Sequence, residues 1–156
     1  HMFNHAMMKG ALFLAVGCIV LRLNSTRLED MAGLSKRMPI TSFAFVLGGL
    51  GLIGVPLTAG FISKWYLLLG TIELGWWPVT ALLLISSLLA VAYVWRFVEV
   101  AYFQPPPEAA PSGEAPLSMQ IPLWLLLTTT LYLGVQTDVT AGLAQRAALW
   151  LLGGGQ

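Results

Sequence analysis

Two lysines lie inside apolar stretches of the sequence. Lys9 lies in the run 1–23, and Lys64 lies in the middle of the run 40–72. Both runs are long enough to span a bilayer, which takes about 20 apolar residues in a helix. A charge near the bilayer centre costs about 3 kcal/mol on the mildest insertion scales, so such residues mark functional sites or are compensated. The sequence therefore predicts a proton or ion pathway inside a membrane protein.

The composition supports a membrane location. The chain has 156 residues, of which 57% are hydrophobic and 10% are charged, against about 25% charged in ordinary soluble domains. Lipid must therefore be the solvent for much of the surface. The predicted fold class is all-α, a polytopic membrane helical bundle. The net charge of +1 gives no reason to expect nucleic acid as a partner.

Apolar segments and a Pro-rich stretch divide the chain. About four membrane helices and a final amphipathic helix are predicted at residues 1–23, 40–72, 76–103, 119–135 and 137–152. The stretch 104–118 contains three consecutive prolines and is typical of a disordered linker. We expect residues 1–156 to be a fragment whose upstream part is missing.

The segment 40–72 is too long for one straight crossing and contains Gly54, Pro56 and Gly60. Proline removes a backbone donor and clashes with the preceding turn, so we expect a broken helix with Lys64 on its second half. Transporters place ion sites at such breaks, and the C-terminal end of the first half-helix would stabilise a cation. The alternative is a lysine that snorkels to the membrane surface from a helix kinked for packing.

A second pattern joins His1, His5 and Lys9, which are spaced four residues apart and share one helix face. Histidine titrates near neutrality, and a desolvated lysine can do so. Bridged by water, this ladder would pass protons. Alternatively, both histidines lie at the membrane interface and Lys9 snorkels. The third ligand of a metal site would have to be the lysine, so no metal site is expected.

The orientation follows from the basic residues of the loops. Loop 24–39 contains Arg27, Lys36 and Arg37, whereas the turn before residue 76 contains only Glu73. Cytoplasmic loops carry an excess of lysine and arginine. We therefore expect a multi-pass protein of the inner (plasma) membrane with loop 24–39 in the cytoplasm.

Three stretches resemble one known family. They read HMFNHAMMKGALFLAVG at 1–17, AGLSKRMP at 32–39 and GVPLTAGFISKW at 54–65. They are similar to the proton-translocating antiporter-like family, which unites the large membrane subunits of respiratory complex I (NADH:quinone oxidoreductase) with those of Mrp-type cation/proton antiporters. The resemblance implies a longer subunit built on inverted repeats, of which this chain is the C-terminal part.

The resemblance also implies roles for single residues. Lys64 matches the channel lysine of the family's broken helix. His5 and Lys9 match residues that continue the central hydrophilic axis, and His1 matches a histidine of some members. The stretches 4–9 and 63–66 look more like the D-type subunit of Mrp antiporters than like complex I subunits.

The predicted function is monovalent cation (Na⁺)/proton antiport by a subunit of a multisubunit complex. Its partners would be other subunits, the lipid bilayer, H⁺ and a monovalent cation. The alternative is a proton-pumping membrane subunit of NADH:quinone oxidoreductase, and a third reading is a purely structural membrane anchor. The chain shows no catalytic chemistry of its own and no motif for NADH, flavin, iron–sulfur clusters or quinone, so no cofactor is expected.

Overall fold

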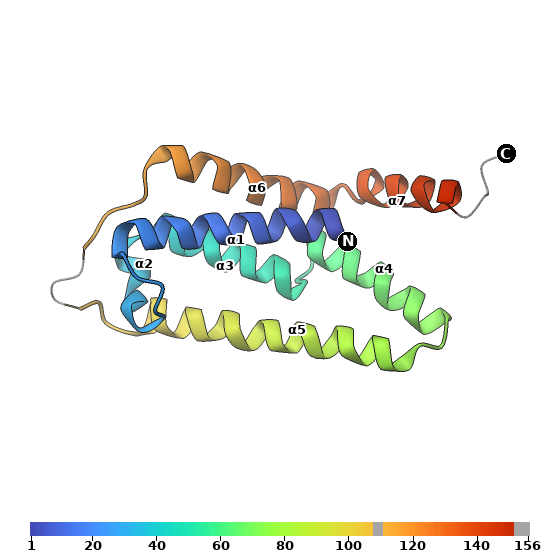
Figure 1. Ribbon diagram of the computed structural model, residues 1–156, viewed down its shortest axis with the longest axis horizontal. Coiled ribbons are helices and arrows are strands. Elements are labelled where there is room, and N and C mark those ends of the chain that lie inside the picture. Colours follow the sequence, from blue (N-terminus) through green and yellow to red (C-terminus); the bar gives the residue numbers. More distant parts are fainter. Residues whose placement is uncertain (108–110, 152–156) are drawn as a thin grey trace.

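The computed structural model describes residues 1–107 and 111–151, and within these ranges every regular element is helical (Figure 1). The elements are α1 (Met2–Leu23), a 3₁₀ turn η1 (Glu29–Met31), α2 (Leu34–Arg37), α3 (Pro39–Ile53), α4 (Ala59–Glu73), α5 (Trp77–Val98), a π-helical turn η2 (Glu99–Phe103), α6 (Leu117–Val135) and α7 (Thr137–Leu151). The predicted all-α class is confirmed.

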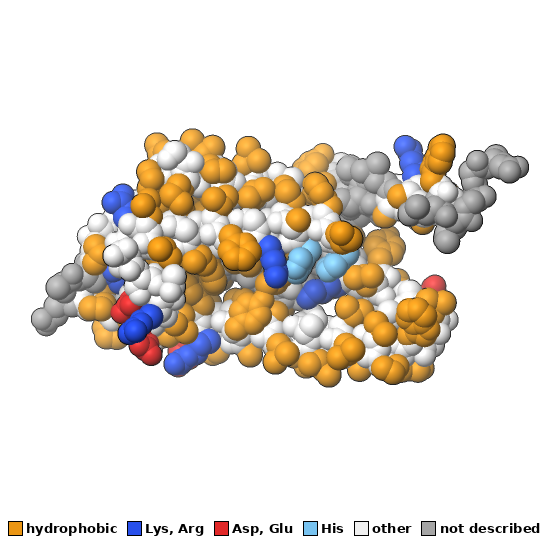
Figure 2. Space-filling view, in the orientation of Figure 1, with side chains coloured by type: hydrophobic (Ala, Val, Ile, Leu, Met, Phe, Trp, Pro, Cys, Tyr) orange, Lys and Arg blue, Asp and Glu red, His pale blue; other side chains and the backbone are white. Residues whose placement is uncertain are grey.

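Three helices are long and apolar enough to cross a membrane, and a shorter apolar helix accompanies them. The three are α1, α5 continued by η2 as Trp77–Phe103, and α6, and the shorter one is α3. Large apolar side chains cover much of the face seen in Figure 2. On α5, Leu82 and Leu88 are 65% and 69% exposed, as expected for a helix whose surroundings are lipid or other subunits. The predicted membrane helical bundle is confirmed.

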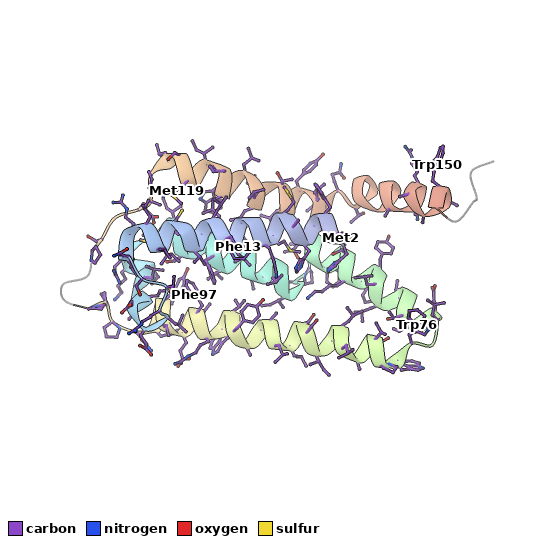
Figure 3. The ribbon with its side chains drawn as sticks, viewed as in Figure 1. Met2, Phe13, Trp76, Phe97, Met119 and Trp150 are labelled. Atoms are coloured by element: carbon purple, nitrogen blue, oxygen red, sulfur yellow. The ribbon has the colours of Figure 1, made fainter. Side chains whose placement is uncertain are left out.

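Helix α3 lies at the centre of the packing, against α1 on one side and α5 on another (Figure 1). Glycines permit these close approaches. A Cβ atom at Gly48 would lie 3.1 Å from Leu12 on α1, and one at Gly49 would lie 2.9 Å from Val94 on α5. At the end of the bundle near α2, Phe97 points inward from α5 (Figure 3) and is 4% exposed.

The predicted segment 40–72 forms two helices separated by irregular backbone. Helix α3 ends at Ile53, and Gly54 follows with a φ of 92°, a conformation that favours glycine. Leu57 also has a positive φ of 76°. Helix α4 begins after Thr58, whose side chain accepts a hydrogen bond from the amide of Phe61 at 3.3 Å. This N-cap lets α4 start within the apolar bundle.

The three residues predicted to break the helix differ in position. Gly54 ends α3, Pro56 lies in the connection, and Gly60 lies in the first turn of α4. A Cβ at Gly60 would overlap the backbone of Gly51 and lie 3.0 Å from the sulfur of Met8. Gly60 therefore allows α4 to approach α3 and α1, rather than ending a helix.

Helix α6 reaches the break through Gly134. A Cβ atom at this position would collide with the backbone of Leu57, Thr58 and Ala59. The last membrane helix is thus in direct contact with the irregular backbone. This contact shields the irregular backbone from lipid.

The Pro-rich stretch was expected to be a disordered linker, but its residues 111–114 are held by hydrogen bonds to the rest of the chain. The guanidinium of Arg37 donates to the carbonyl of Pro111 at 3.1 Å, and the amide of Gly113 donates to the carbonyl of Arg37 at 3.1 Å. Arg22 on α1 donates through Nε to the carbonyl of Glu114 at 2.8 Å. Proline carbonyls remain good acceptors, so arginines fix a segment whose composition suggests disorder.

The carboxylate of Glu114 caps the N-terminus of α3. It accepts hydrogen bonds from the amide of Ile40 at 2.6 Å, the hydroxyl of Thr41 at 2.7 Å and the amide of Gln120 at 3.2 Å. Helix N-termini have unpaired amides and a partial positive charge, which a carboxylate satisfies.

Helix α7 continues α6 beyond the level of the break (Figure 1). It covers 137–151 of the predicted helix 137–152, and residue 152 lies outside the described residues. The side chains of Val139 and Leu143, two apolar residues of this helix, are likewise not among those described.

Candidate functional site

Lys64 on α4 turns back onto the end of α3. Its Nζ donates hydrogen bonds to the carbonyls of Leu52 at 2.8 Å and Ile53 at 3.1 Å. A third bond goes to the hydroxyl of Ser87 on α5 at 2.8 Å. The last carbonyls of a helix have no partners within it and carry partial negative charge. The lysine amine occupies the position where those carbonyls need a donor.

The lysine stem crosses the break at Gly54. A Cβ atom there would lie 3.2 Å from Cδ of Lys64, so the glycine serves the side chain as well as the backbone turn. The amine ends on acceptors inside the bundle, whereas a snorkelling lysine would extend toward water. This geometry disfavours the snorkelling alternative for Lys64.

Ser87 indicates the depth of the amine. It lies ten residues after Trp77 in the 27-residue apolar stretch Trp77–Phe103. At about 1.5 Å per residue, that distance is about 15 Å. The hydrocarbon core of a bilayer is about 30 Å thick. If this stretch spans the bilayer, the amine lies near its middle.

His1 connects α1 to α4 beside the lysine. Its Nδ1 lies 2.9 Å from the hydroxyl of Ser63, and that hydroxyl also bonds the carbonyl of Gly60 at 3.2 Å. Because a hydroxyl has one proton and a carbonyl only accepts, the serine donates to Gly60 and accepts from Nδ1–H. The rings of His1 and His5 are 5.6 Å apart, a separation that water bridges readily.

Lys9 completes the group. It is exposed and lines an apolar hollow of about 140 Å³ that is closed on the α3 side by Leu52, whose carbonyl binds Lys64. His5 lies within electrostatic range of both lysines. Figure 2 shows the two histidines together on one face, with lysine or arginine side chains directly beside them. The structure thus gathers all four predicted pathway residues near the break.

A larger cavity of about 370 Å³ opens next to His1, with Asn4, Ser63 and Tyr66 among its lining residues. Asn4 donates to the carbonyl of Ala59 at 3.2 Å, so it joins α1 to the first residue of α4. The other polar atom of the Asn4 side chain, Oδ1, is buried and has no hydrogen-bond partner among the described residues.

Sequence reasoning missed the contributions of Asn4 and Ser87. The available signal for Ser87 was the pair Ser86–Ser87, two polar residues in the middle of an apolar helix. Their spacing from Lys64 along the chain gives no indication of contact. Only the packing of α5 against α3 and α4 brings the hydroxyl to the amine.

Comparison with known proteins now adds to this geometry. Residues 1–90 match the family model described as "NADH:quinone oxidoreductase/Mrp antiporter, TM". The chain belongs to this family. The resemblance carried by the three sequence stretches is confirmed, and the protein is a multi-pass membrane protein of the antiporter-like type.

Relatives come from both branches. The chain is 38% identical to NADH-quinone oxidoreductase subunit N of Desulforudis audaxviator, over 97% of this chain and 33% of that protein. It is 27% identical to the D-type subunit of the Na(+)/H(+) antiporter of Bacillus subtilis, over 97% of this chain and 31% of that protein. The chain therefore spans about a third of the length of these curated relatives.

The fold is shared with a chain of a solved Mrp complex. The structure of the Mrp complex from Dietzia sp. DQ12-45-1b contains a chain that matches with a TM-score of 0.85 over 94% of this chain and 35% of that one. The sequence identity is 23%, so this likeness establishes the fold.

Proposed function

We propose that the chain is part of an ion-translocating membrane subunit in which protons pass through Lys64. The observation that carries the proposal is the position of its amine, bonded to the last carbonyls of α3 and to Ser87 at the middle of an apolar helix. Lysine carries a titratable proton, which a proton-conducting site requires.

The amine has two states in this scheme. As an ammonium it is held by the partial negative charge at the end of α3. When it releases its proton, this attraction falls, and the break, with Leu57 at positive φ, is the part of the backbone that can respond. His1, His5 and Lys9 lie on the side of α1 that faces the break. They would exchange protons with the Lys64 amine through water.

The subunit would work inside a multisubunit complex in the plasma membrane, with loop 24–39 in the cytoplasm. The relatives are named as subunits, which supports a place in a multisubunit complex. A single cysteine at Ser35 should react with a membrane-impermeant reagent only from the cytoplasmic side, and one at Gly75 only from outside. Labelling of Ser35 from outside would exclude this orientation.

The leading candidate for the coupled process is exchange of protons for Na⁺, as the resemblance to the D-type subunit implies. A second candidate is proton pumping driven by electron transfer in other subunits. The higher identity to NADH-quinone oxidoreductase subunit N, 38% against 27% for the antiporter relative, favours this second process. Lys64 would be the proton-carrying group in both.

The test uses inverted membrane vesicles containing the whole complex. Adding Na⁺ should collapse an imposed pH gradient if the process is antiport, and adding the electron donor should build one if it is redox-driven. Lys64→Ala should abolish either signal while immunoblots show normal subunit levels. Lys64→Arg should fail as well, because arginine stays protonated. Normal transport in Lys64→Ala would refute the proposal.

A further inference from the structure

Ser87 differs from the adjacent Ser86 and from Thr130 on α6. Ser86 donates to the carbonyl of Leu83 at 2.8 Å, and Thr130 donates to the carbonyl of Leu126 at 2.8 Å. Such bonds to the preceding turn occupy the hydroxyl proton. Ser87 makes no such bond among the described residues. Its one hydrogen bond there is the bond that it accepts from Lys64, so its own proton remains available.

The donors and acceptors around the amine match both of its protonation states. An ammonium has three N–H donors, which meet the two carbonyls of α3 and the oxygen of Ser87. A neutral amine has two N–H donors and one lone pair. The carbonyls still accept from the two donors, but the lone pair needs a donor. Within the described residues, Ser87 is the one contact of the amine that can donate.

We propose that Ser87 is a positioning residue that holds the Lys64 amine in both states by reversing its hydrogen bond. It accepts from the ammonium and donates to the neutral amine, and its proton stays on the hydroxyl throughout. The amine thus remains in register with the end of α3 while it gains and loses a proton. This inference rests on the proposed function, because it requires that Lys64 changes protonation.

The neighbouring charges do not compete with this role. His5 on α1 lies within electrostatic range of both Lys64 and Lys9, His1 bonds Ser63 beside the lysine, and α3 has no ionisable side chain. Tyr93 and Arg96 on α5 and Glu99 in η2 lie at least six residues beyond Ser87, and α6 has Tyr132. Replacing Ser87 therefore removes a hydrogen bond without changing the local charge.

The test compares Ser87→Ala and Ser87→Thr with Ser86→Ala, an adjacent serine that lacks the contact. Transport rate is measured against pH in vesicles containing the whole complex. Ser87→Ala should lower the rate about tenfold, the size expected for losing one hydrogen bond to a charged group. Its pH profile should move toward lower pH, because the ammonium has lost an acceptor. The transport rate of Ser87→Thr should lie within about twofold of the wild-type rate. The rate of Ser86→Ala should equal the wild-type rate.

The outcomes separate this inference from the proposed function. If Lys64→Ala abolishes transport while Ser87→Ala keeps the wild-type rate and pH profile, the role of Ser87 is refuted and the function stands. A Ser87→Ala rate loss with an unmoved pH profile and no rescue by threonine also refutes it, because that pattern is a packing defect. If Lys64→Ala transports normally, the function fails and the role of Ser87 fails with it.

Discussion

The two ends of α3 are both met by a charged side chain from a distant part of the chain. At the N-terminus the carboxylate of Glu114 accepts from the amide of Ile40, and at the C-terminus the amine of Lys64 donates to the last two carbonyls. Each charge opposes the partial charge of the helix end that it meets. In both cases α3 obtains from tertiary structure a cap that its own sequence lacks.

The difference lies in how many other groups hold each charge. Glu114 is tied by Thr41, by Gln120 and, through its backbone carbonyl, by Arg22. Lys64 has one further bond, to a hydroxyl that can reverse. The first charge is therefore locked into a network, whereas the second can be lost as a proton while the neutral amine still donates to both carbonyls. Measuring stability and transport in matched variants separates a cap that only stabilises the fold from a cap that takes part in transport.

The largest effect on transport should come from removing the charge of Lys64. Lys64→Met should lower transport by more than about tenfold. The complex should still assemble, because removing the buried charge offsets the cost of leaving the carbonyls of Leu52 and Ile53 without their donor. Transport in vesicles and the amount of assembled complex are the two measurements. A Lys64→Met variant with normal transport per assembled complex but a reduced amount of complex would invert the comparison.

The second effect concerns the structural charge. Glu114→Met should lower the free energy of unfolding by about 2 kcal/mol, because the Ile40 amide and two side chains lose their acceptor. Transport per assembled complex should stay near wild type. The midpoint of thermal unfolding of the purified complex reports the change.

Glu99→Met is the matched control. Glu99 pairs with Arg96 at 2.7 Å on an exposed face, and such pairs contribute little. Equal losses in both variants would mean that the cap at α3 adds no stability.

The smallest effect should come from the arginine that fixes the stretch carrying Glu114. Arg37 donates to the carbonyls of Pro111, Asp30 and Ala32, a set that the branched guanidinium reaches and a lysine does not. Burial lowers the pKa of Arg37, and nearby Asp30 opposes that change, but the side chain stays charged at neutral pH. Arg37→Lys should therefore lower the free energy of unfolding by about 1 kcal/mol.

Arg27→Lys makes the same change in the same loop, where the side chain of Arg27 has no hydrogen bond in the described structure. Thermal unfolding should show no difference from wild type in this variant. A similar shift in both variants would mean that the change from arginine to lysine in this loop causes the effect, rather than the loss of the contact between Arg37 and the Pro-rich stretch.

The sequence predicted the parts of this arrangement that depend on local chemistry. The length of the apolar stretches predicted the bounds of the membrane helices to within a few residues. Gly54 and Pro56 predicted irregular backbone where α3 ends. The partial charge of a helix end also predicted that a cation would be stabilised there, and the amine of Lys64 meets it.

The parts that depend on tertiary contacts were not predictable. Ser87 and Glu114 act on partners 23 and 74 residues away, and their own neighbours in sequence do not indicate which groups they meet. The Pro-rich stretch is another example. Its composition reports the absence of regular structure, whereas its order comes from arginines on α1 and in the first loop.

The contact of Gly134 with the break has a consequence for biosynthesis. Gly134 follows Lys64 by 70 residues, so at about 5–20 residues per second the ribosome adds it about 4–14 s later. During that interval the helices up to α5 have been made, but the backbone at Leu57 and Thr58 still lacks the surface of α6 that covers it. The lysine site therefore gains its covering surface only when α6 enters the bilayer, and a nascent chain stalled after α5 leaves this irregular backbone uncovered in the membrane.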